Sequence, residues 1–205
     1  MKRILAISDI HGCLSKLEKV LEEAKYNPNT DQLILLGDYI DRGKQSYEVV
    51  QRVKELVKGG AIALKGNHEL MAINAFKGSG GTMWLYNGGR ETLESYARNY
   101  AVINDDIEFF ESLPDWHETD DYIFVHAGLD PEEPLPELTP QADLLWIRDE
   151  WFNSDYTGKP VIFGHTPMSD IQIWPNGKKI AIDTGAVFGG KLSCIELPTM
   201  KKFAA

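Results

Sequence analysis

The stretch Gly37-Asp38-Tyr39-Ile40-Asp41-Arg42-Gly43 decides how this chain of 205 residues is interpreted. It follows an apolar run of strand length, 33–36, and its glycines allow the backbone to turn sharply away from that strand. The stretch therefore predicts a loop at the carboxyl end of a strand, where open α/β sheets bind their ligands. In such a loop Asp38 can bridge two metal ions, Arg42 can hold an anion, and Asp41 can steady a neighbouring histidine. The alternative is a surface turn with solvated charges, and the rest of the chain has to decide between the two.

The composition is that of a globular protein with an excess of acidic groups. Hydrophobic residues make up 43% of the chain and the formal net charge is -10, which argues against a general nucleic-acid or anionic-membrane surface. No stretch approaches the roughly 20 apolar residues of a membrane-spanning helix. Only two cysteines are present, without a zinc-ligand spacing. We therefore expect a cytoplasmic protein that folds as a single domain over residues 1–205 and binds neither nucleic acid nor membrane.

Apolar runs of strand type alternate with amphipathic helical segments, which is typical of an α/β architecture. We expect strands at 4–7, 33–36, 61–64, 122–125, 161–163, 171–174, 178–182 and, as the last one, 192–197. We expect helices at 14–24, 49–57, 68–76, 91–100, 105–113 and around 144–146. The glycine-rich segment 78–89 is predicted to be a loop despite Trp84 and Tyr86, and 130–140 an acidic, proline-rich loop.

Four of the five histidines follow an apolar strand within a few residues, and only His117, interpreted as solvated or structural, does not. Strands of one sheet carry their carboxyl ends to a common edge, so the polar residues of these loops are expected to meet. The residues concerned are His11, His68, His126 and His165, together with Asp9, Asp38 and Asn67. A mixed set of imidazole, carboxylate and amide ligands suits divalent ions such as Mn, Fe or Zn, and the absence of thiolates argues against a structural zinc.

The segments that carry these residues resemble the five signature blocks of the PPP-type phosphoprotein phosphatases, in the order found in that family. They are Asp9 to Gly12, Gly37 to Gly43, Gly66 to Glu69, His126 to Gly128 and Gly164 to Thr166. Three further segments resemble the compact bacterial and phage branch, which includes the bacteriophage lambda protein phosphatase: Trp84 to Gly89, Trp146 to Arg148 and Ile182 to Phe188. The first block departs from the family in having Ser8 where glycine is usual.

The resemblance implies a calcineurin-like metallophosphoesterase fold, in which a two-sheet β-sandwich is flanked by α-helices. It implies two divalent metal ions, with Mn as the first choice and Fe or Zn as alternatives. One ion would be held by Asp9, His11 and Asp38, and the other by Asp38, Asn67, His126 and His165. The phosphate would be bound by Arg42, Arg148, Asn67 and His68. By the same resemblance, His68 would be the general acid and Asp41 would orient it.

Charge counting supports this interpretation. Two divalent ions, two carboxylates and a bridging hydroxide leave about one net positive charge, which Arg42 and Arg148 raise to about three. The hydroxide would attack phosphorus directly, and His68 would protonate the leaving oxygen. The sequence therefore predicts a metal-dependent phosphomonoesterase, a protein serine/threonine phosphatase acting on phosphoproteins or phosphopeptides.

Two other functions remain open at this point. One is a symmetrical dinucleoside tetraphosphate hydrolase acting on dinucleoside polyphosphates, because these enzymes resemble the family and share its metal site. They typically lack the second aspartate of the central block, so Asp41 points away from them. The other is a non-catalytic interaction module on the same scaffold, although such proteins usually lose metal ligands or the acid histidine.

Several residues also have a purely structural interpretation. Arg42 can form a salt bridge that ties its loop, and Arg148 can pair with a neighbouring acidic residue. Trp84 and Tyr86 can be core aromatics rather than parts of a substrate entrance. Glu69 follows the proposed acid histidine, and we expect it to be structural.

Overall fold

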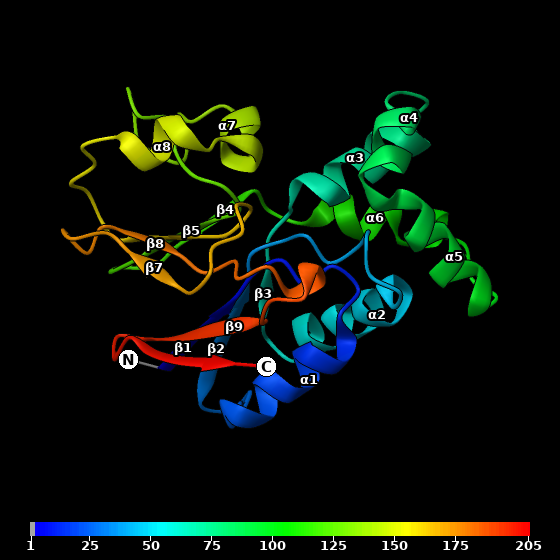
Figure 1. The fold of residues 1–205 in the computed structure, drawn as a ribbon, viewed down its shortest axis with the longest axis horizontal. Helices are drawn as coiled ribbons and strands as arrows, with labels where there is room; N and C mark the ends of the chain where they lie inside the picture. The colour runs from blue at the N-terminus through cyan, green and yellow to red at the C-terminus, as the bar shows by residue number, and fades with distance from the viewer. Residues whose placement is uncertain (1–2) are drawn as a thin grey trace.

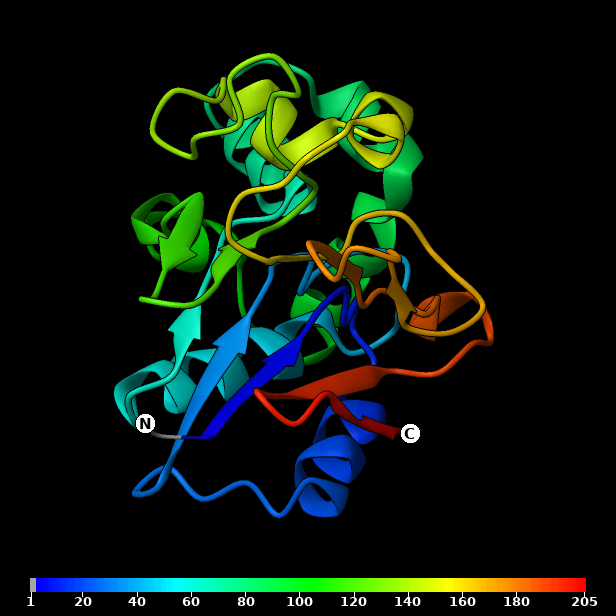
Figure 2. The same ribbon diagram turned by 90° about the vertical axis from the view of Figure 1, so that its left-hand side faces the viewer.

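The computed structural model describes residues 3–205, which form two five-stranded β-sheets stacked between helices (Figures 1 and 2). The first sheet has the order β10 (Lys201–Ala204), β9 (Ser193–Leu197), β1 (Arg3–Ile7), β2 (Asp31–Leu35) and β3 (Ile62–Ala63). The second has the order β4 (Trp116–Glu118), β5 (Ile123–Val125), β6 (Val161–Phe163), β8 (Lys179–Ala181) and β7 (Gln172–Ile173). The predicted two-sheet sandwich flanked by helices is therefore confirmed.

Parallel pairing brings the loops that follow the central strands to common edges. β1, β2 and β3 run parallel, with Ile7 opposite Leu35 and Leu35 opposite Ala63. In the second sheet β5, β6 and β8 also run parallel. The remaining strands are antiparallel, and β7 and β8 form the hairpin that the Pro175-Asn176-Gly177 turn predicts. The carboxyl ends of the parallel strands are where the sequence placed its candidate site.

The central strands are apolar on both faces because each sheet is covered on both sides. On β1, Ile4 and Ala6 pack in the core between the two sheets, whereas Leu5 and Ile7 pack against helices. The second sheet likewise shares that central core through Phe124 and Ile162. Its opposite face packs beneath α7 and α8, with Trp151 at the centre.

Most helices cover the first sheet, and two short ones cover the second. The first group comprises α1 (Leu14–Glu23), α2 (Ser46–Lys58), α3 (Asn67–Phe76), α4 (Gly81–Trp84), α5 (Arg90–Arg98) and α6 (Asn104–Ser112). The second comprises α7 (Gln141–Trp146) and α8 (Asp149–Asn153), and the short 3-10 helix η2 (Ala186–Phe188) lies between β8 and β9. None of the helices within residues 3–205 is long and apolar enough to cross a membrane.

The prediction of a loop at 78–89 is wrong for residues 81–89. This segment forms α4 and a π-helical turn, η1 (Leu85–Gly89), in which Gly88 has a φ of 108°. Tertiary packing of Trp84 outweighs the poor helix propensity of the glycines. A Cβ on Gly89 would lie 2.6 Å from the Trp84 ring, so this position requires glycine, and Phe76 contacts the same ring edge to face.

Two edge strands were not predicted. β10 follows β9, so the expectation that 192–197 is the last strand is wrong. Its lysines are exposed and it lies at the edge of the sheet, so it lacks the apolar run by which buried strands are recognised. β4 carries His117, whose ring stacks on Phe124 with the ring centroids 6.3 Å apart. His117 therefore has a structural contact on an edge strand.

Candidate metal centre and active site

The candidate site residues lie where parallel strands end. Asp9 and His11 follow β1, the central stretch 37–43 follows β2, Asn67 and His68 open α3 after β3, and His126 and His165 follow β5 and β6. The backbone is left-handed at several of these positions, which include Asp9, His11, Asp38, Asp41, Arg42 and His165. Such conformations are costly for residues other than glycine and concentrate at functional sites, where the surrounding structure imposes them.

Glycines allow the loops to approach one another closely. A Cβ on Gly43 would overlap the carbonyl oxygen of His11, and a Cβ on Gly164 would overlap the side chains of Ser8 and Asp9. The backbones of the loops after β2 and β6 therefore pack directly against the loop after β1, which brings imidazole and carboxylate groups from distant parts of the chain together.

Two buried groups of histidine and aspartate side chains share Asp38. The first consists of His11, Asp38 and His68, and the second of Asp38, His126 and His165; the ligand atoms of each group lie within 4.8 Å of one another. Oδ2 of Asp38 lies 3.4 Å from Nε2 of His11 and 3.5 Å from Nε2 of His126. The carboxylate predicted to bridge two ions is therefore the side chain that belongs to both groups.

The hydrogen bonds leave lone pairs pointing into these groups. Nδ1 of His11 lies 2.7 Å from the carbonyl oxygen of Ile40, and Nδ1 of His126 lies 2.8 Å from that of Leu36. A carbonyl oxygen only accepts, so both Nδ1 atoms carry the proton and both Nε2 atoms are acceptors when the rings are neutral. Burial lowers the pKa of His11 well below its ordinary value, which favours the neutral ring.

Asn67 joins the second group. Its Oδ1 lies 2.8 Å from Nε2 of His126 and 3.0 Å from Nδ1 of His165. Nε2 of His165 is buried and has no hydrogen-bond partner in the part of the chain that the structure describes, and burial lowers the pKa of His165 to about 2. Oδ1 of Asn67 and Nε2 of His126 are both acceptors, and acceptor atoms at such a distance repel unless a cation lies near them. The donor set, which is imidazole, carboxylate and amide without thiolate, fits divalent ions.

Asp9 is buried beside these groups but belongs to neither. Its Oδ2 accepts hydrogen bonds from the backbone N–H of His165, at 3.0 Å, and from the hydroxyl of Ser8. Burial and the neighbouring carboxylate of Asp183 raise the pKa of Asp9 well above its ordinary value. Ser8, which departs from the usual family pattern, thus contacts Asp9 directly.

Asp183 was not among the predicted site residues. It is 3% exposed, its Oδ1 accepts a hydrogen bond from the N–H of Gly185, and burial raises its pKa. It follows β8, which is parallel to β6, so the rule that located the histidines would also have located Asp183. Asp9, Asp38 and Asp183 place three buried carboxylates in one region, and a bound cation would relieve their mutual repulsion.

Asp41 holds His68 from one side. Its Oδ2 lies 2.6 Å from Nδ1 of His68, and its Oδ1 accepts a hydrogen bond from the hydroxyl of Thr92 at 2.7 Å. Nε1 of Trp84 donates to the same carboxylate at 3.0 Å. Sequence reasoning missed Thr92 and left Trp84 as a core aromatic or entrance residue; no local pattern connects either one to Asp41. Tyr86, which was considered with Trp84, is 91% exposed.

Glu69 fixes the backbone of the central stretch. Its carboxylate accepts hydrogen bonds from the N–H groups of Asp38, Tyr39 and Gly66 at 2.8–2.9 Å. The side chain is completely buried, so these bonds bind the loop after β2 to the start of α3. The structural role that we expect for Glu69 is thus the positioning of Asp38.

Both predicted arginines line a cavity of about 140 Å³ above the buried groups, together with Asp38, Asn67, His68 and His165. Neither arginine forms a salt bridge with a carboxylate among residues 3–205, so the purely structural interpretation finds no support there. Nη1 of Arg148 donates to the hydroxyl of Thr166 at 3.2 Å, and Nη1 of Arg42 lies 2.7 Å from Nε2 of His11. Both guanidinium charges are left for a ligand.

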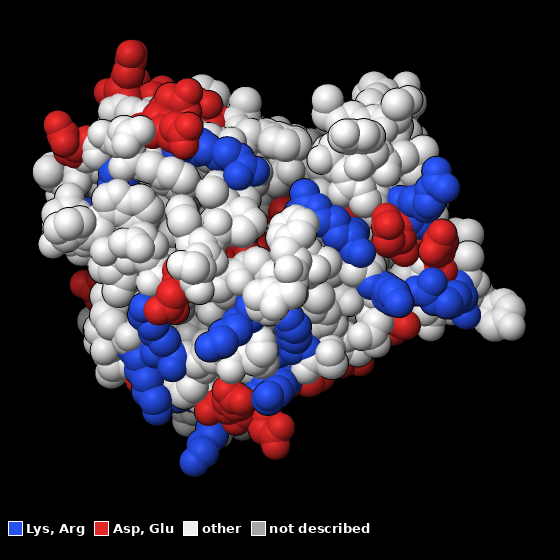
Figure 3. Space-filling view, viewed as in Figure 1, with Lys and Arg blue, Asp and Glu red and all other residues white. Residues whose placement is uncertain are grey.

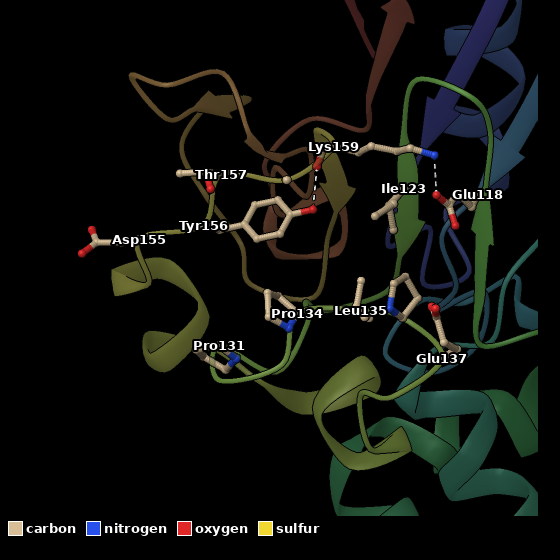
Figure 4. A pocket seen from close by; sticks show the side chains of 12 residues that line it. Glu118, Ile123, Pro131, Pro134, Leu135, Glu137, Asp155, Tyr156, Thr157 and Lys159 are labelled. Carbon is tan, nitrogen blue, oxygen red and sulfur yellow. Dashed lines mark hydrogen bonds and ion pairs between the residues drawn. The ribbon is translucent and has the colours of Figure 1, made fainter.

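A larger cavity, of about 460 Å³, lies elsewhere in the protein (Figure 4). It is lined by the loops around Pro134 and Tyr156, and Lys159 pairs there with Glu118. It contains no histidine, so it offers no comparable ligand set. On the face in Figure 3, basic side chains are interspersed with acidic ones, and acidic side chains gather over the α7–α8 region.

Comparison with known proteins agrees with this geometry. The sequence profile of the family described as calcineurin-like phosphoesterase matches residues 2–192. The chain is 34% identical to serine/threonine-protein phosphatase 1 of Salmonella typhimurium, over 94% of this chain and 90% of the relative. It is 33% identical to serine/threonine-protein phosphatase 2 of Escherichia coli, over 94% and 91% of the two chains. An asymmetrical bis(5'-nucleosyl)-tetraphosphatase of Bacillus cereus is 29% identical, over 95% and 90%.

Solved structures share the fold at lower sequence identity. A candidate diadenosine tetraphosphatase superimposes with a TM-score of 0.80 at 22% identity, covering 100% of this chain and 93% of that one. A cold-active protein-tyrosine phosphatase from Shewanella superimposes with a TM-score of 0.71 at 19% identity, covering 100% and 80%. The chain belongs to the calcineurin-like phosphoesterase family and is a hydrolase homologous to bacterial serine/threonine-protein phosphatases.

Proposed function

We propose that this protein is a metal-dependent protein serine/threonine phosphatase. One observation carries the proposal: two buried histidine and aspartate groups share Asp38 beneath a cavity lined by two arginines that form no salt bridge with a carboxylate among residues 3–205. Such a site provides cation ligands below and positive charge above, which matches a phosphate monoester dianion. Relatives named as serine/threonine-protein phosphatases cover more than nine tenths of the chain and support the same substrate class.

We assign Asp9, His11 and Asp38 to one metal ion, and Asp38, Asn67, His126 and His165 to the other. Asp9 is included because its buried carboxylate lies beside Asp38 and Asp183 and requires a compensating charge. A pair of divalent ions, when bound, lowers the pKa of coordinated water towards neutrality and neutralises phosphate charge. Mn is our first choice, and Fe and Zn suit the same ligands.

Arg42 and Arg148 would hold the phosphate from the open side of the cavity, because a guanidinium group can donate to two phosphate oxygens at once. Asn67 and His68 line the floor and can donate to the phosphate as well. These four side chains would orient the ester so that its leaving oxygen faces His68.

His68 would protonate the leaving oxygen. Burial and the positive charge of Arg42 lower the pKa of His68, which makes its protonated form a stronger acid. The carboxylate of Asp41, 2.6 Å from Nδ1, would hold the ring in place and direct Nε2 into the cavity. His68 is treated as the acid rather than as a ligand because its Nε2 is 3.9 Å from Asp38 Oδ2, farther than that of His11 or His126.

A second candidate function is hydrolysis of dinucleoside tetraphosphates. It is favoured by the Bacillus cereus relative, which has an asymmetrical specificity, whereas the sequence alone suggested a symmetrical one. The two specificities give different products from diadenosine tetraphosphate, namely ATP with AMP or two molecules of ADP.

One activity panel tests these proposals. Purified protein is stripped of metal, reloaded with Mn, Fe or Zn, and assayed on phosphoserine, phosphothreonine and phosphotyrosine peptides and on diadenosine tetraphosphate. We expect phosphate release from the phosphoserine and phosphothreonine peptides and its loss in the His68→Ala variant. Nucleotide products without peptide dephosphorylation would replace the first proposal by the second. No hydrolysis of any substrate with any metal would contradict both and would favour a non-catalytic module.

A further inference from the structure

Arg42 packs against an aromatic ring, and no carboxylate among residues 3–205 forms a salt bridge with it. The Cζ atom of Arg42 lies 5.3 Å from the centroid of the Phe188 ring, and Phe188 lines the same cavity as the guanidinium. Gly88 confines Arg42 on another side. The backbone N–H of Arg42 donates to the carbonyl of Gly88. The side-chain stem of Arg42 also lies close to Gly88, since a Cβ on Gly88 would lie 2.8 Å from Cγ of Arg42. Arg148, the other cavity arginine, bonds to a hydroxyl, and no aromatic ring among residues 3–205 forms a cation–π contact with it.

Phe188 is exposed, but its backbone is firmly held. Phe188 is 63% exposed, so its position cannot be explained by burial in the core. Phe188 lies in η2, where its N–H and that of Gly190 both donate to the carbonyl of Gly185 at 2.9 Å. From α1, Nζ of Lys16 donates to the carbonyls of Ala186 and Gly190 at 2.8 and 2.6 Å. These bonds tie the loop on both sides of the exposed ring.

The chemistry of the contact suits a phosphate-binding arginine. A carboxylate partner would neutralise the guanidinium and occupy its N–H donors. An aromatic face attracts the cation without using any donor, so the charge stays available for phosphate oxygens, as do the N–H groups other than the one at Nη1, which faces Nε2 of His11 at 2.7 Å. The aromatic face is therefore the property that matters, and the apolar volume of the side chain is secondary.

We propose that Phe188 is a positioning residue that holds the guanidinium of Arg42 over the cavity, and that Lys16 maintains this contact by anchoring the η2 loop. The inference rests on the proposed function, because it assumes that Arg42 binds the phosphate of the substrate. It assigns Phe188 no direct contact with the reacting atoms.

The test compares Phe188→Ala, Phe188→Leu and Phe188→Tyr in the full-length, metal-loaded protein. The readouts are the inhibition constant of inorganic phosphate, the KM and kcat for p-nitrophenyl phosphate, and the melting temperature. Loss of an exposed cation–π contact predicts about two- to fivefold weaker phosphate binding in the alanine and leucine variants, with near-normal values in the tyrosine variant. The melting temperature should stay that of wild type, because the ring is mostly exposed. Tyr100→Ala, at an exposed aromatic outside the cavity, is the matched control.

A double-mutant cycle with Arg42→Ala decides whether Phe188 acts through Arg42. In the Arg42→Ala variant we expect Phe188→Ala to have no further effect on phosphate binding. Lys16→Met should weaken phosphate binding only when Arg42 is present. A leucine variant that matches wild type would overturn the proposal, and so would an alanine effect that persists without Arg42.

If wild type hydrolyses no phosphomonoester, the proposed function fails, and calorimetry with inorganic phosphate tests Phe188 separately. Absence of phosphate binding to wild type would overturn the inference as well.

Discussion

Nδ1 of His68 lies 2.6 Å from Oδ2 of Asp41, and both side chains are almost completely buried. At this separation a proton must lie between the two atoms, whichever of them carries it. Trp84 and Thr92 donate to the same carboxylate, so its orientation is fixed from three sides. The pair therefore presents Nε2 of His68 to the cavity in a single orientation, which is what a proton donor to a leaving group needs.

The first prediction concerns this pair. His68→Ala should lower kcat for a phosphoserine peptide by about 10²- to 10⁴-fold, because the alkoxide leaving group needs a proton. Asp41→Asn should lower it by about 10- to 100-fold, because the neutral amide no longer provides the negative charge that stabilises protonated His68. With p-nitrophenyl phosphate, whose leaving group departs without a proton, both losses should be much smaller. Steady-state kinetics on the two substrates measures this, and equal losses on both would contradict the role of His68 as acid.

The second prediction concerns the backbone support beneath Asp38. Glu69→Ala would leave the buried N–H groups of Asp38, Tyr39 and Gly66 without an acceptor. We expect the free energy of unfolding to fall by about 3 kcal/mol or more, since each unsatisfied group costs about 1 kcal/mol or more. Urea titration measures the change. Glu94→Ala, at an exposed position on α5, should change stability by less than about 0.5 kcal/mol. Similar stabilities of the two variants would argue against this network.

The third prediction concerns metal binding. Metal present at 100 times its dissociation constant should stabilise the folded protein by about 2.7 kcal/mol, and a chelator should remove this gain. His165→Ala removes a proposed ligand whose Nε2 has no partner among residues 3–205, so it should lose most of the gain and part of the bound metal. His117→Ala, on edge strand β4, should keep both. Elemental analysis and thermal unfolding measure these effects, and full metal content in the His165 variant would contradict the assignment.

The fourth prediction concerns pH. Burial raises the pKa of Asp41 to about 7, above its ordinary value of 3.8. Because the folded state holds the proton more tightly, the contribution of Asp41 to stability is fully present below pH 3.8 and is lost as pH rises towards 7. Asp41→Asn removes this titration. The stability of the variant relative to wild type should therefore rise between pH 4 and 7, by up to about 4 kcal/mol, and then level off. Chemical unfolding of the metal-free proteins measures this, and a constant difference would contradict the raised pKa.

The strands and the order of the site residues could be predicted from local sequence. Buried strands such as β1 and β6 are continuous apolar runs, and polar residues directly after them must lie at the edge of a parallel sheet. The edge strand β10 and the helical segment 81–89 could not be predicted in this way. The exposed lysines of β10 interrupt the apolar pattern of a strand, and the packing of Trp84 determines the helical structure of 81–89. Neither feature can therefore be recognised from local periodicity.

The sequence by itself determined the residue types, their spacing and their attachment to strand ends, because these depend on contacts within a few residues. Only the tertiary structure decided which atoms face one another. It placed Asp38 in both buried groups of histidine and aspartate side chains, joined Trp84 and Thr92 to Asp41, and set Phe188 against Arg42. The contacts of Asp41 and Arg42 join residues more than 40 positions apart. They arise from the packing of two sheets and their loops, which no local pattern specifies.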